Sequence, residues 1–269
     1  MKHTFFSIIY MMAIVIFAIA FAACENGGEN KMSLTINIKG NVSIFLAGSG
    51  SAAIDWGDGT KKGKYELTYF GESLFWDEER EDEYTKSHYY SGTSVRTITI
   101  TGKNITRLDC SGLGLTNLEI CNYPTLIMLG CRINQLTNLD VSNNMALTTL
   151  GCGSNQLTSL DVSNNPVLTI LSCENNQLTS LDVSNNFVLT SLVCKKNKLT
   201  SLDVSKCSEL SYVSCSGNLF SAEALNALFN TLPLRPEEKE GVILIPEQIL
   251  VIGKFQATKD GVIVSKSKT

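Results

Sequence analysis

The stretch that decides the fold is LTTLGCGSNQLTSLDVSNNPV, which runs from Leu147 to Val167. Its segment LTSLDVSNN begins at Leu157 and returns unchanged at Leu178. The closely similar LTNLDVSNN begins at Leu136 and LTSLDVSKC begins at Leu199, so the period is 21 residues. Self-similarity at a fixed period of this length indicates a solenoid, in which each unit packs on its neighbours and the stack shares one core.

The repeating unit predicts a short strand with one buried and one exposed face. Read from Leu147, it is LTTLGCGSNQL, which resembles the leucine-rich-repeat pattern LxxLxLxxNxL with cysteine at the third apolar position. Side chains alternate along a strand, so Leu150 and Cys152 are expected to point into the core. Thr149 and Gly151 are then expected on the concave face of the solenoid.

Cysteines recur at the same period and predict a buried ladder. Adjacent strands hold equivalent side chains about 4.8 Å apart, wider than the ~3.8 Å between Cβ atoms that a disulfide requires. Metal ligands converge on one point, whereas stacked repeats spread equivalent residues along a line. We therefore expect free thiols in the core and no metal site. The ladder consists of Cys110, Cys131, Cys152, Cys173, Cys194 and Cys215.

Two polar columns share this period. Asparagine amides can satisfy backbone groups at the turn that leaves each strand. That column consists of Asn134, Asn155, Asn176, Asn197 and Asn218. Aspartates of the LDV segment form an outward-facing column, in which like charges at strand spacing repel unless hydrogen bonds or cations compensate them. For Asp140, Asp161, Asp182 and Asp203 we favour hydrogen bonds. Calcium is the alternative, and no other cofactor is expected.

The complete pattern, LTxLxCxxNQLTSLDVSNN over about Ile105 to Phe220, resembles the cysteine-ladder subclass of internalin-type bacterial leucine-rich repeats. The resemblance implies that the concave strand face contacts a partner macromolecule. A column of small residues framed by bulkier ones predicts a shallow groove for a protein, peptide or glycan. The candidate contact residues are Met128, Gly130, Arg132, Thr149, Gly151, Ile170, Ser172, Glu174, Ser191, Val193, Lys195, Lys196, Tyr212 and Ser214.

Residues 1–23 have the order of a secretory signal. Lys2 precedes an uncharged apolar stretch that ends in FAAC, with the cysteine at Cys24. This order resembles the lipobox of bacterial lipoproteins, which implies that Cys24 is lipidated and becomes the mature N-terminus. An uncleaved anchor helix is the alternative, because the stretch is long enough to span a bilayer. Both interpretations tether the protein outside the cytoplasm. The lipid-anchored form is expected in the cell envelope, at the outer membrane or cell surface of a Gram-negative bacterium. Residues 24–32 are polar and are expected to form a tether.

Residues 33–102 are rich in alternating β-type runs separated by glycine turns, which predict a small β-sandwich. Asp58-Gly59 is a hairpin signal, because both central positions of such a turn require positive φ. The motif IDWGDGT followed by SHYYSGT resembles the polycystic-kidney-disease (PKD) module, an immunoglobulin-like sandwich. We expect Trp56 to pack inward and His88 to be structural. The acidic insertion from Gly71 to Lys86 is either solvated surface or a loop that binds a cation or a partner.

A solenoid needs a cap at each end, because the terminal repeats otherwise expose an apolar layer. The residues VRTITITG that close the N-terminal module can cover the first repeat. Ser221 is a good N-cap for a helix that ends before Pro233, and GVILI and GVIV then read as short closing strands. The fold class is therefore mainly β. A PKD-like sandwich is followed by a leucine-rich-repeat solenoid over residues 103–220 and by a short helical C-terminal cap over 221–269.

Composition narrows the function. The formal charge is −4 and there is no basic cluster, which argues against nucleic acid as a partner. Catalysis is not expected either, because no GxSxG elbow, phosphate loop or cysteine paired with a base is found. The leading hypothesis is a binding or adhesion protein that captures a ligand on the concave face, with the membrane contacted only through the lipid anchor. The alternative is a structural envelope scaffold, with or without calcium, that has no specific ligand.

Overall fold

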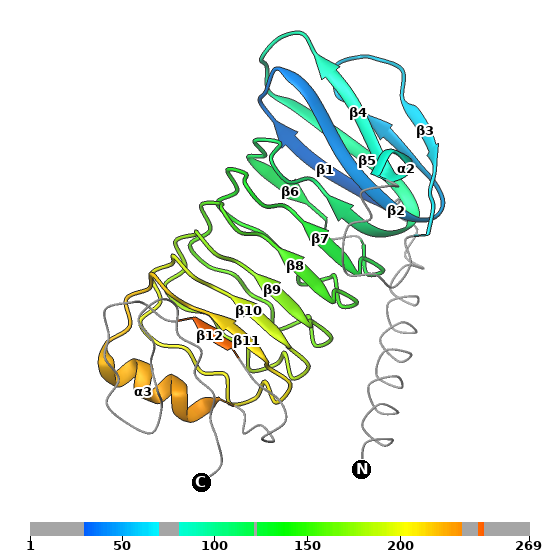
Figure 1. Ribbon diagram of the computed structural model, residues 1–269. Coiled ribbons are helices and arrows are strands. Elements are labelled where there is room, and N and C mark those ends of the chain that lie inside the picture. Colours follow the sequence, from blue (N-terminus) through cyan, green and yellow to red (C-terminus); the bar gives the residue numbers. More distant parts are fainter. Residues whose placement is uncertain (1–29, 70–80, 121–122, 233–241, 245–269) are drawn as a thin grey trace.

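The computed structural model describes residues 30–69, 81–120, 123–232 and 242–244. A module of long strands lies at one end of a stack of short parallel strands, and a helix lies at the other end (Figure 1). The fold is mainly β, as expected, with one solenoid of repeats along most of its length. Among the described residues, no helix has the length and apolar character that crossing a membrane requires.

The N-terminal module is built from five strands and one helical turn. They are β1 (Lys31–Ile36), β2 (Gly40–Asp55), β3 (Gly63–Glu66), α2 (Glu81–Tyr84), β4 (Thr85–Tyr90) and β5 (Arg96–Asp109). Strand β2 pairs antiparallel with β3, β4 and β5, and β1 pairs antiparallel with β5. The short β6 (Asn117–Glu119) folds back to pair with β1. The module and the first repeat are therefore joined through hydrogen-bonded strands.

Strand β5 belongs to both parts of the molecule. Its first half lies between β1 and β2, and its last three residues pair in parallel with the first repeat strand, β7 (Met128–Gly130). Alternation along β5 places Ile98 and Ile100 in the core of the module, while Leu108 starts the core of the solenoid. The domain boundary expected between residues 102 and 103 thus falls inside one continuous strand. The module begins at Lys31, two residues before the expected start, because Lys31 and Met32 already pair with β5.

An irregularity in β2 lets one long strand serve several partners. Its register with β5 shifts between Ala47 and Gly48 and again between Ser49 and Ala52. Bulges of this kind bend a strand and increase its twist. At Gly48 the backbones approach so closely that an added Cβ would lie 2.0 Å from the carbonyl oxygen of Asn104. Only glycine fits this position without moving the backbone.

The hairpin between β2 and β3 forms, but the expected two-residue turn at Asp58-Gly59 does not. The last pair of β2 and β3 is Ile54 with Gly63, so residues 55–62 connect the two paired segments. Positive φ occurs at Gly57 and Gly59, whereas Asp58 has none. The Asp58 carboxylate accepts hydrogen bonds from the backbone and hydroxyl of Thr60 instead. This local side-chain bond organises a wider loop in place of the tight turn.

The solenoid strands stack in parallel at the predicted period. After β7 come β8 (Thr149–Gly151), β9 (Ile170–Ser172), β10 (Ser191–Val193) and β11 (Tyr212–Ser214). Each pairs residue for residue with the strand of the next repeat. The leucine and cysteine columns are fully buried, and the apolar core runs without interruption from the N-terminal module to the C-terminal helix. Stacking therefore produces one core rather than two separate ones.

A column of residues with left-handed backbone conformation follows the strands. Residue types could not predict this column, because its members differ widely in type. The backbone there has φ between 54° and 71°. Glycine tolerates this conformation, whereas a β-branched residue such as Ile133 is strained in it. The column consists of Gly112, Ile133, Ser154, Asn175, Lys196 and Gly217.

The C-terminal cap has the expected helix. Helix α3 spans Ala222–Thr231, and the Ser221 side chain accepts a hydrogen bond from the Ala224 backbone. Leu225, Leu228 and Phe229 are buried against the last repeat. Strand β12 (Val242–Leu244) pairs with β11, which confirms the closing strand expected at GVILI. The expected GVIV strand, the signal peptide, Cys24 and residues 71–80 of the acidic insertion lie outside the described residues.

Candidate functional site: the concave strand face

The outward-pointing residues of the repeat strands form three columns. The first contains Met128, Thr149, Ile170, Ser191 and Tyr212, all of them partly exposed. The second contains Gly130, Gly151, Ser172, Val193 and Ser214. The third lies two residues further on and contains Arg132, Gly153, Glu174, Lys195 and Ser216. The structure thus brings the candidate residues together on one surface, with one exception described below.

Alternation alone does not decide exposure on this face. Gly130, Ser172 and Ser214 point outward, as expected, yet they are buried. At Gly130 an added Cβ would lie 2.2 Å from an Asp109 carboxylate oxygen, so the Asp109 side chain covers that position. Ser172 is enclosed by the side chains that it binds. The part of this face that solvent can reach is accordingly smaller than the strand pattern predicts.

A polar network crosses the middle of the face and spans two repeats. Arg132 donates from Nη2 to Ser172 Oγ at 2.8 Å and to a carboxylate oxygen of Glu174. Ser172 Oγ donates to the other Glu174 oxygen at 2.8 Å. Charge-assisted bonds of this kind are stronger than neutral ones and hold the guanidinium in one orientation. The network leaves the Arg132 side chain 46% exposed and the Glu174 side chain 15% exposed, so a partner can reach the cation more easily than the anion.

Gly153 makes room for this network, whereas a Cβ added at Gly151 would meet it only in ordinary van der Waals contact. A Cβ at Gly153 would lie 2.5 Å from the Glu174 carboxylate, and a Cβ at Gly151 would lie 3.5 Å from Arg132 Cδ. Any larger residue at Gly153 would displace Glu174 from its position beside Arg132. The small column predicted from the sequence is therefore the floor on which a charged pair lies, and only part of it is open to a partner.

The ionisation of Glu174 follows from these contacts. Its partial burial would raise the pKa, but hydrogen bonds from Ser172, from its own backbone N–H and from Arg132 outweigh that effect and lower it. A lowered pKa keeps the carboxylate charged near neutral pH. The pair is therefore a stable feature of the face.

Lys196 is the exception among the candidate residues. It occupies the left-handed column with φ 54° in the turn after the strand, so it does not belong to the strand face. Lys195 precedes it and continues the third column. The strand pattern did not distinguish the two lysines, because the turn begins within the KKN segment.

Arg107 is a concave residue that the sequence analysis did not select. It pairs in register with Met128, donates to Met128 Sδ at 3.6 Å and is 8% exposed. Burial lowers the pKa of its guanidinium, although arginine stays protonated in proteins. Extending the 21-residue period backward from Met128 would have identified it. The candidate list nevertheless began one repeat later, at Met128, although residue 107 lies within the expected solenoid of residues 103–220.

The predicted asparagine column connects adjacent repeats. In Asn176, Oδ1 accepts from the Leu157 backbone at 3.0 Å, and Nδ2 donates to the carbonyls of Cys152 and Cys173 at 3.1 Å. The other members repeat this arrangement. Each amide therefore satisfies backbone groups of its own repeat and of the preceding one, which rigidifies the face above it.

A second asparagine column lies on the convex side and was missed. Asn144, Asn165 and Asn186 are fully buried, and each Nδ2 donates to two carbonyls of the preceding repeat. Their Oδ1 atoms accept no hydrogen bond from the described residues. Cys207 occupies the equivalent position of the last repeat and contacts the Val183 carbonyl. The second asparagine of the repeated SNN motif was the available signal.

The cysteine ladder is confirmed, and all seven described cysteines are buried and form no disulfide. Burial raises the pKa of every ladder thiol, to about 12 for Cys152 and Cys215. A protonated, enclosed thiol is a poor nucleophile and a poor metal ligand. The ladder therefore acts as a column of small apolar side chains.

The aspartate column is held by local hydrogen bonds. Asp182 Oδ1 accepts from the Ser184 backbone at 2.8 Å, and the same bond recurs in the other three repeats. Bonds to the serine two residues later lower the pKa of each aspartate. Within the described part of the chain, no group of three or more His, Cys, Asp or Glu side chains is placed to hold a metal ion.

His88 lies in an aromatic cluster of the N-terminal module. Its ring stacks on Trp56 with centroids 5.0 Å apart, and its Nε2 lies 2.7 Å from Asp58 Oδ2. Tyr90 donates its hydroxyl to the Trp56 carbonyl at 2.5 Å. Trp56 is 3% exposed, which confirms the expected inward packing. These contacts close the loop after β2 onto strand β4.

Comparison with known proteins finds similarity to leucine-rich-repeat structures. No family model matches the chain, and neither does any curated protein sequence. The functional domain of InlJ from Listeria monocytogenes, which includes a cysteine ladder, is 36% identical over 48% of this chain and 33% of that chain, with a TM-score of 0.41. An internalin (inlF) from the same species is 22% identical over 49% and 37%, with a TM-score of 0.39. A leucine-rich-repeat protein of Leptospira interrogans is 21% identical over 42% and 37%, with a TM-score of 0.35.

In each of these matches the chain spans well under half of the other protein's length. The fold assignment therefore depends on the repeat geometry of this chain. One three-residue strand per 21-residue repeat, a buried leucine column, a cysteine ladder and asparagine bridges between repeats define a mainly β solenoid of leucine-rich-repeat type.

Proposed function

We propose that the chain is a non-catalytic, lipid-anchored cell-envelope protein that binds a protein, peptide or glycan partner through its concave face. The observation that carries this proposal is the guanidinium of Arg132, which Ser172 and Glu174 hold in place across two repeats. A side chain already held in its bound orientation loses less conformational entropy on association. Arginine is also among the residues enriched at protein interfaces.

The surroundings of Arg132 support a partner with both polar and apolar groups. Ile170, Val193 and Tyr212 are partly exposed on neighbouring strands of the same face, and Lys195 is exposed in the third column. Aromatic and arginine side chains supply most of the binding energy in typical interfaces. The exposed part of the face carries polar, apolar and charged side chains side by side. This mixture favours an extended peptide, a protein loop or a glycan over a small apolar molecule.

The anchor and the N-terminal module complete the proposal. Cys24 after a basic and apolar segment supports lipidation, and the resulting protein would be displayed at the outer membrane or cell surface. The Trp56, Asp58 and His88 cluster supports a PKD-like module that spaces the solenoid from the membrane. Buried, protonated cysteines support the absence of nucleophilic catalysis.

Site-directed photocrosslinking on intact cells tests the binding face. A photoreactive residue replaces Ser191 at the centre of the face or, as the matched control, Ser180, which is exposed outside the strand face. We expect a covalent adduct from position 191 alone. Combining the label with Tyr212→Ala and Arg132→Gln should abolish the adduct, because both contacts would be lost.

The same cells distinguish this proposal from a purely structural role. External protease should remove the protein if it is displayed on the surface, and Cys24→Ser should release it from the membrane fraction. Protection from protease, together with equal adducts from positions 191 and 180, would contradict the proposal and favour an envelope scaffold.

A further inference from the structure

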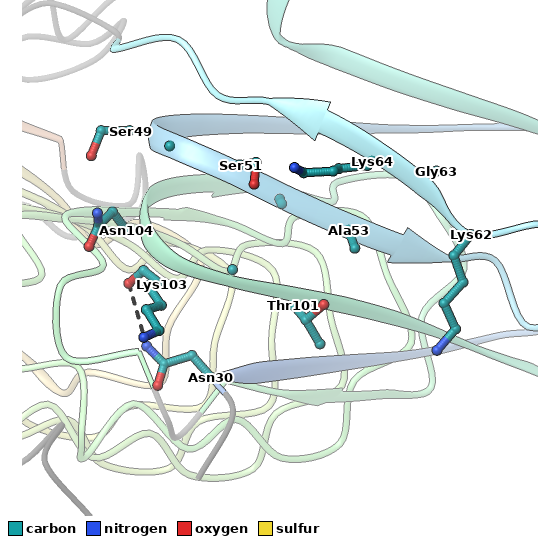
Figure 2. Close-up of a pocket in the computed structure, with 13 residues that line it drawn as sticks. Asn30, Ser49, Ser51, Ala53, Lys62, Gly63, Lys64, Thr101, Lys103 and Asn104 are labelled. Atoms are coloured by element: carbon teal, nitrogen blue, oxygen red, sulfur yellow. Dashed lines mark hydrogen bonds between the residues drawn. The ribbon is translucent and has the colours of Figure 1, made fainter. Parts of the chain in front are cut away.

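A cleft lies on the N-terminal module and is lined by residues of β2, β3 and β5 together with Asn30. It has a volume of about 620 Å³ and lies over the bulge of β2, between β3 and β5. In Figure 2, the Lys64 side chain extends from β3 toward Ser51, Lys62 lies at the right, and Lys103 and Asn30 lie at the lower left. Lys64 of β3 and Lys103 of β5 thus line the same cleft from separate strands.

The floor exists because β2 has a bulge. Gly50 and Ser51 are the unpaired residues of the second register shift, between the pairs Ser49–Asn104 and Ala52–Gly102, and therefore lie opposite Lys103. Gly50 has φ +78°, and no heavy atom lies within 4 Å of where its Cβ would be. Small side chains therefore leave the strand surface open here, while the neighbouring strands carry the long basic ones.

The described part of the lining contributes several hydrogen-bond donors and no carboxylate. Three lysines line the cleft with hydroxyl and amide side chains, including Ser51 and Thr101, while Glu66 further along β3 is not part of the lining. Lys62 pairs with Asp55 at 3.3 Å. Lys64 and Lys103 are exposed, and among the described residues no carboxylate forms an ion pair with either of them.

The entry of the chain from the tether is fastened beside this cleft. The Asn30 carbonyl accepts from the Tyr123 hydroxyl at 2.8 Å and from the Gly102 backbone at 3.4 Å. Its side-chain amide donates to the Lys103 carbonyl at 3.4 Å. Tyr123 belongs to the first repeat, and burial raises the pKa of its phenol, so it stays a donor. The cleft is thus rigidly placed at the point where the tether begins.

We propose that this cleft binds a phosphate group, either free or as the headgroup of an anionic lipid. Several lysines and hydroxyls that approach from different sides suit an anion with three or four acceptor oxygens. A planar carboxylate is matched better by the fork of an arginine, whereas lysine binds phosphate as a point charge.

The lipid source follows from chain length and depends on the proposed lipidation of Cys24. Five residues separate Cys24 from Asn30, and the six steps between these two residues can span at most about 22 Å. The cleft would then lie within reach of the membrane surface, where anionic headgroups attract basic side chains. A free phosphate group would use the same donors without this geometric condition.

Amine-reactive footprinting tests the proposal with inorganic phosphate as the probe. The full-length protein in nonionic detergent is acetylated with increasing phosphate, and chloride at equal ionic strength is the reference. We expect the modification rates of Lys64 and Lys103 to fall roughly tenfold when phosphate reaches about ten times its Kd. Lys195 and Lys196 on the solenoid provide the internal control and should keep their rates.

Variants separate a specific site from general screening. K64Q/K103Q should abolish the phosphate-dependent protection of Lys62, whereas the matched K195Q/K196Q should leave it unchanged. If phosphate slows the modification of the control lysines, Lys195 and Lys196, as much as that of the cleft lysines, the proposal is overturned. Protection of Lys62 that survives K64Q/K103Q would overturn it as well.

Nanodiscs identify the source of the phosphate group. The full-length protein is inserted into discs of phosphatidylcholine, with or without phosphatidylglycerol, in phosphate-free buffer. Slower modification of Lys64 and Lys103 in the anionic discs alone assigns the site to a lipid headgroup. Equal rates in both discs, with slowing only after inorganic phosphate is added, assign it to free phosphate. Absence of both effects overturns the site, and crosslinking from position 191 is independent of that outcome.

Discussion

The solenoid and the N-terminal module satisfy their backbones in different ways. In the solenoid, one amide such as Asn176 makes the same bonds in each repeat, so one rule applies many times. In the module, single contacts do the corresponding work, such as Tyr90 to the Trp56 carbonyl and the close approach at Gly48. Periodic structure is therefore legible from sequence, whereas structure built from unique contacts is not.

The two parts are nevertheless one hydrogen-bonded body. Strand β5 runs through both, and Tyr123 of the first repeat donates to Asn30 at the start of the module. A substitution that destabilises one part is therefore expected to lower the stability of the other part through β5. The predictions below use this difference in construction, in order of expected size.

The largest loss is expected for Asn176→Ala in the middle of the solenoid. The change leaves the Leu157 N–H without a partner and removes one of the two asparagine bonds to each of the Cys152 and Cys173 carbonyls, which keep their bonds from Asn155 and Asn197. The loss of three bonds, one of them leaving an unpaired buried donor, costs roughly 3–5 kcal/mol of unfolding free energy. Urea unfolding measures this value. Asn218→Ala should cost less, because Asn218 is only partly buried and water can replace it. Equal losses at the two positions would contradict the bridging role of the buried amide.

The second change, Gly48→Ala, tests a unique contact of the module. Its Cβ would lie 2.0 Å from the Asn104 carbonyl oxygen, so the β2 and β5 backbones must separate. We expect a loss of about 3 kcal/mol, typical of overpacking that moves a backbone. Gly92→Ala is the matched control, because nothing lies within 4 Å of its Cβ position. If both variants unfold at the same urea concentration, the close approach is not a constraint.

A gain in stability is expected from Ile133→Asn. Ile133 has φ 55° and is 68% exposed, so its strain is removed while little burial is lost. A left-handed conformation costs about 1–2 kcal/mol for most residues and less for asparagine, so we expect a gain of about 1 kcal/mol. The reciprocal Asn175→Ile should lose a similar amount at the same position of a later repeat. Thermal unfolding that moves in the same direction for both variants would be inconsistent with this explanation.

The smallest effect is the acid sensitivity of the loop after β2. The Thr60 hydroxyl and the nearby His88 lower the pKa of Asp58 from 3.8 to about 2. Because the folded pKa is depressed, this stabilisation is present above pH 4 and is lost as the pH falls toward 2. After allowance for solvent screening, it is expected to be a fraction of ~1 kcal/mol. Unfolding free energies measured against pH should converge for wild type and Asp58→Asn at the acid end, and parallel curves would argue against this role.

Much of the solenoid was predictable, and the reasons are local. Leu150, Cys152 and Asn155 could be assigned to the core because their spacing repeats, and Ser221 could be assigned as an N-cap from its own chemistry. The second buried asparagine, Asn165, repeats equally well but was overlooked, because SNN reads as a polar turn. The tight turn at Asp58-Gly59 failed because Asp58 bonds to Thr60 instead.

The candidate site was predicted only in outline. Strand alternation selected the right columns, but it did not show that Glu174 lies over Gly153 or that Arg132 reaches two repeats away. Lys195 and Lys196 were indistinguishable, because a backbone angle separates them. The lysines of the cleft gave no signal, since Lys103 lies far from Lys62 and Lys64 in sequence and lines the same cleft only when β3, β2 and β5 pair.

The sequence by itself determined the period, the inward columns and the helical cap, because each follows from local geometry repeated along the chain. Tertiary structure alone decided that both parts of the molecule share β5 and that Gly153 makes room for the Arg132–Glu174 pair. It also decided that Lys64 and Lys103 line one cleft at the β2 bulge. The physical reason is range. A repeat encodes its neighbours through fixed spacing, whereas contacts between distant, unrepeated segments depend on how whole strands bend and pair.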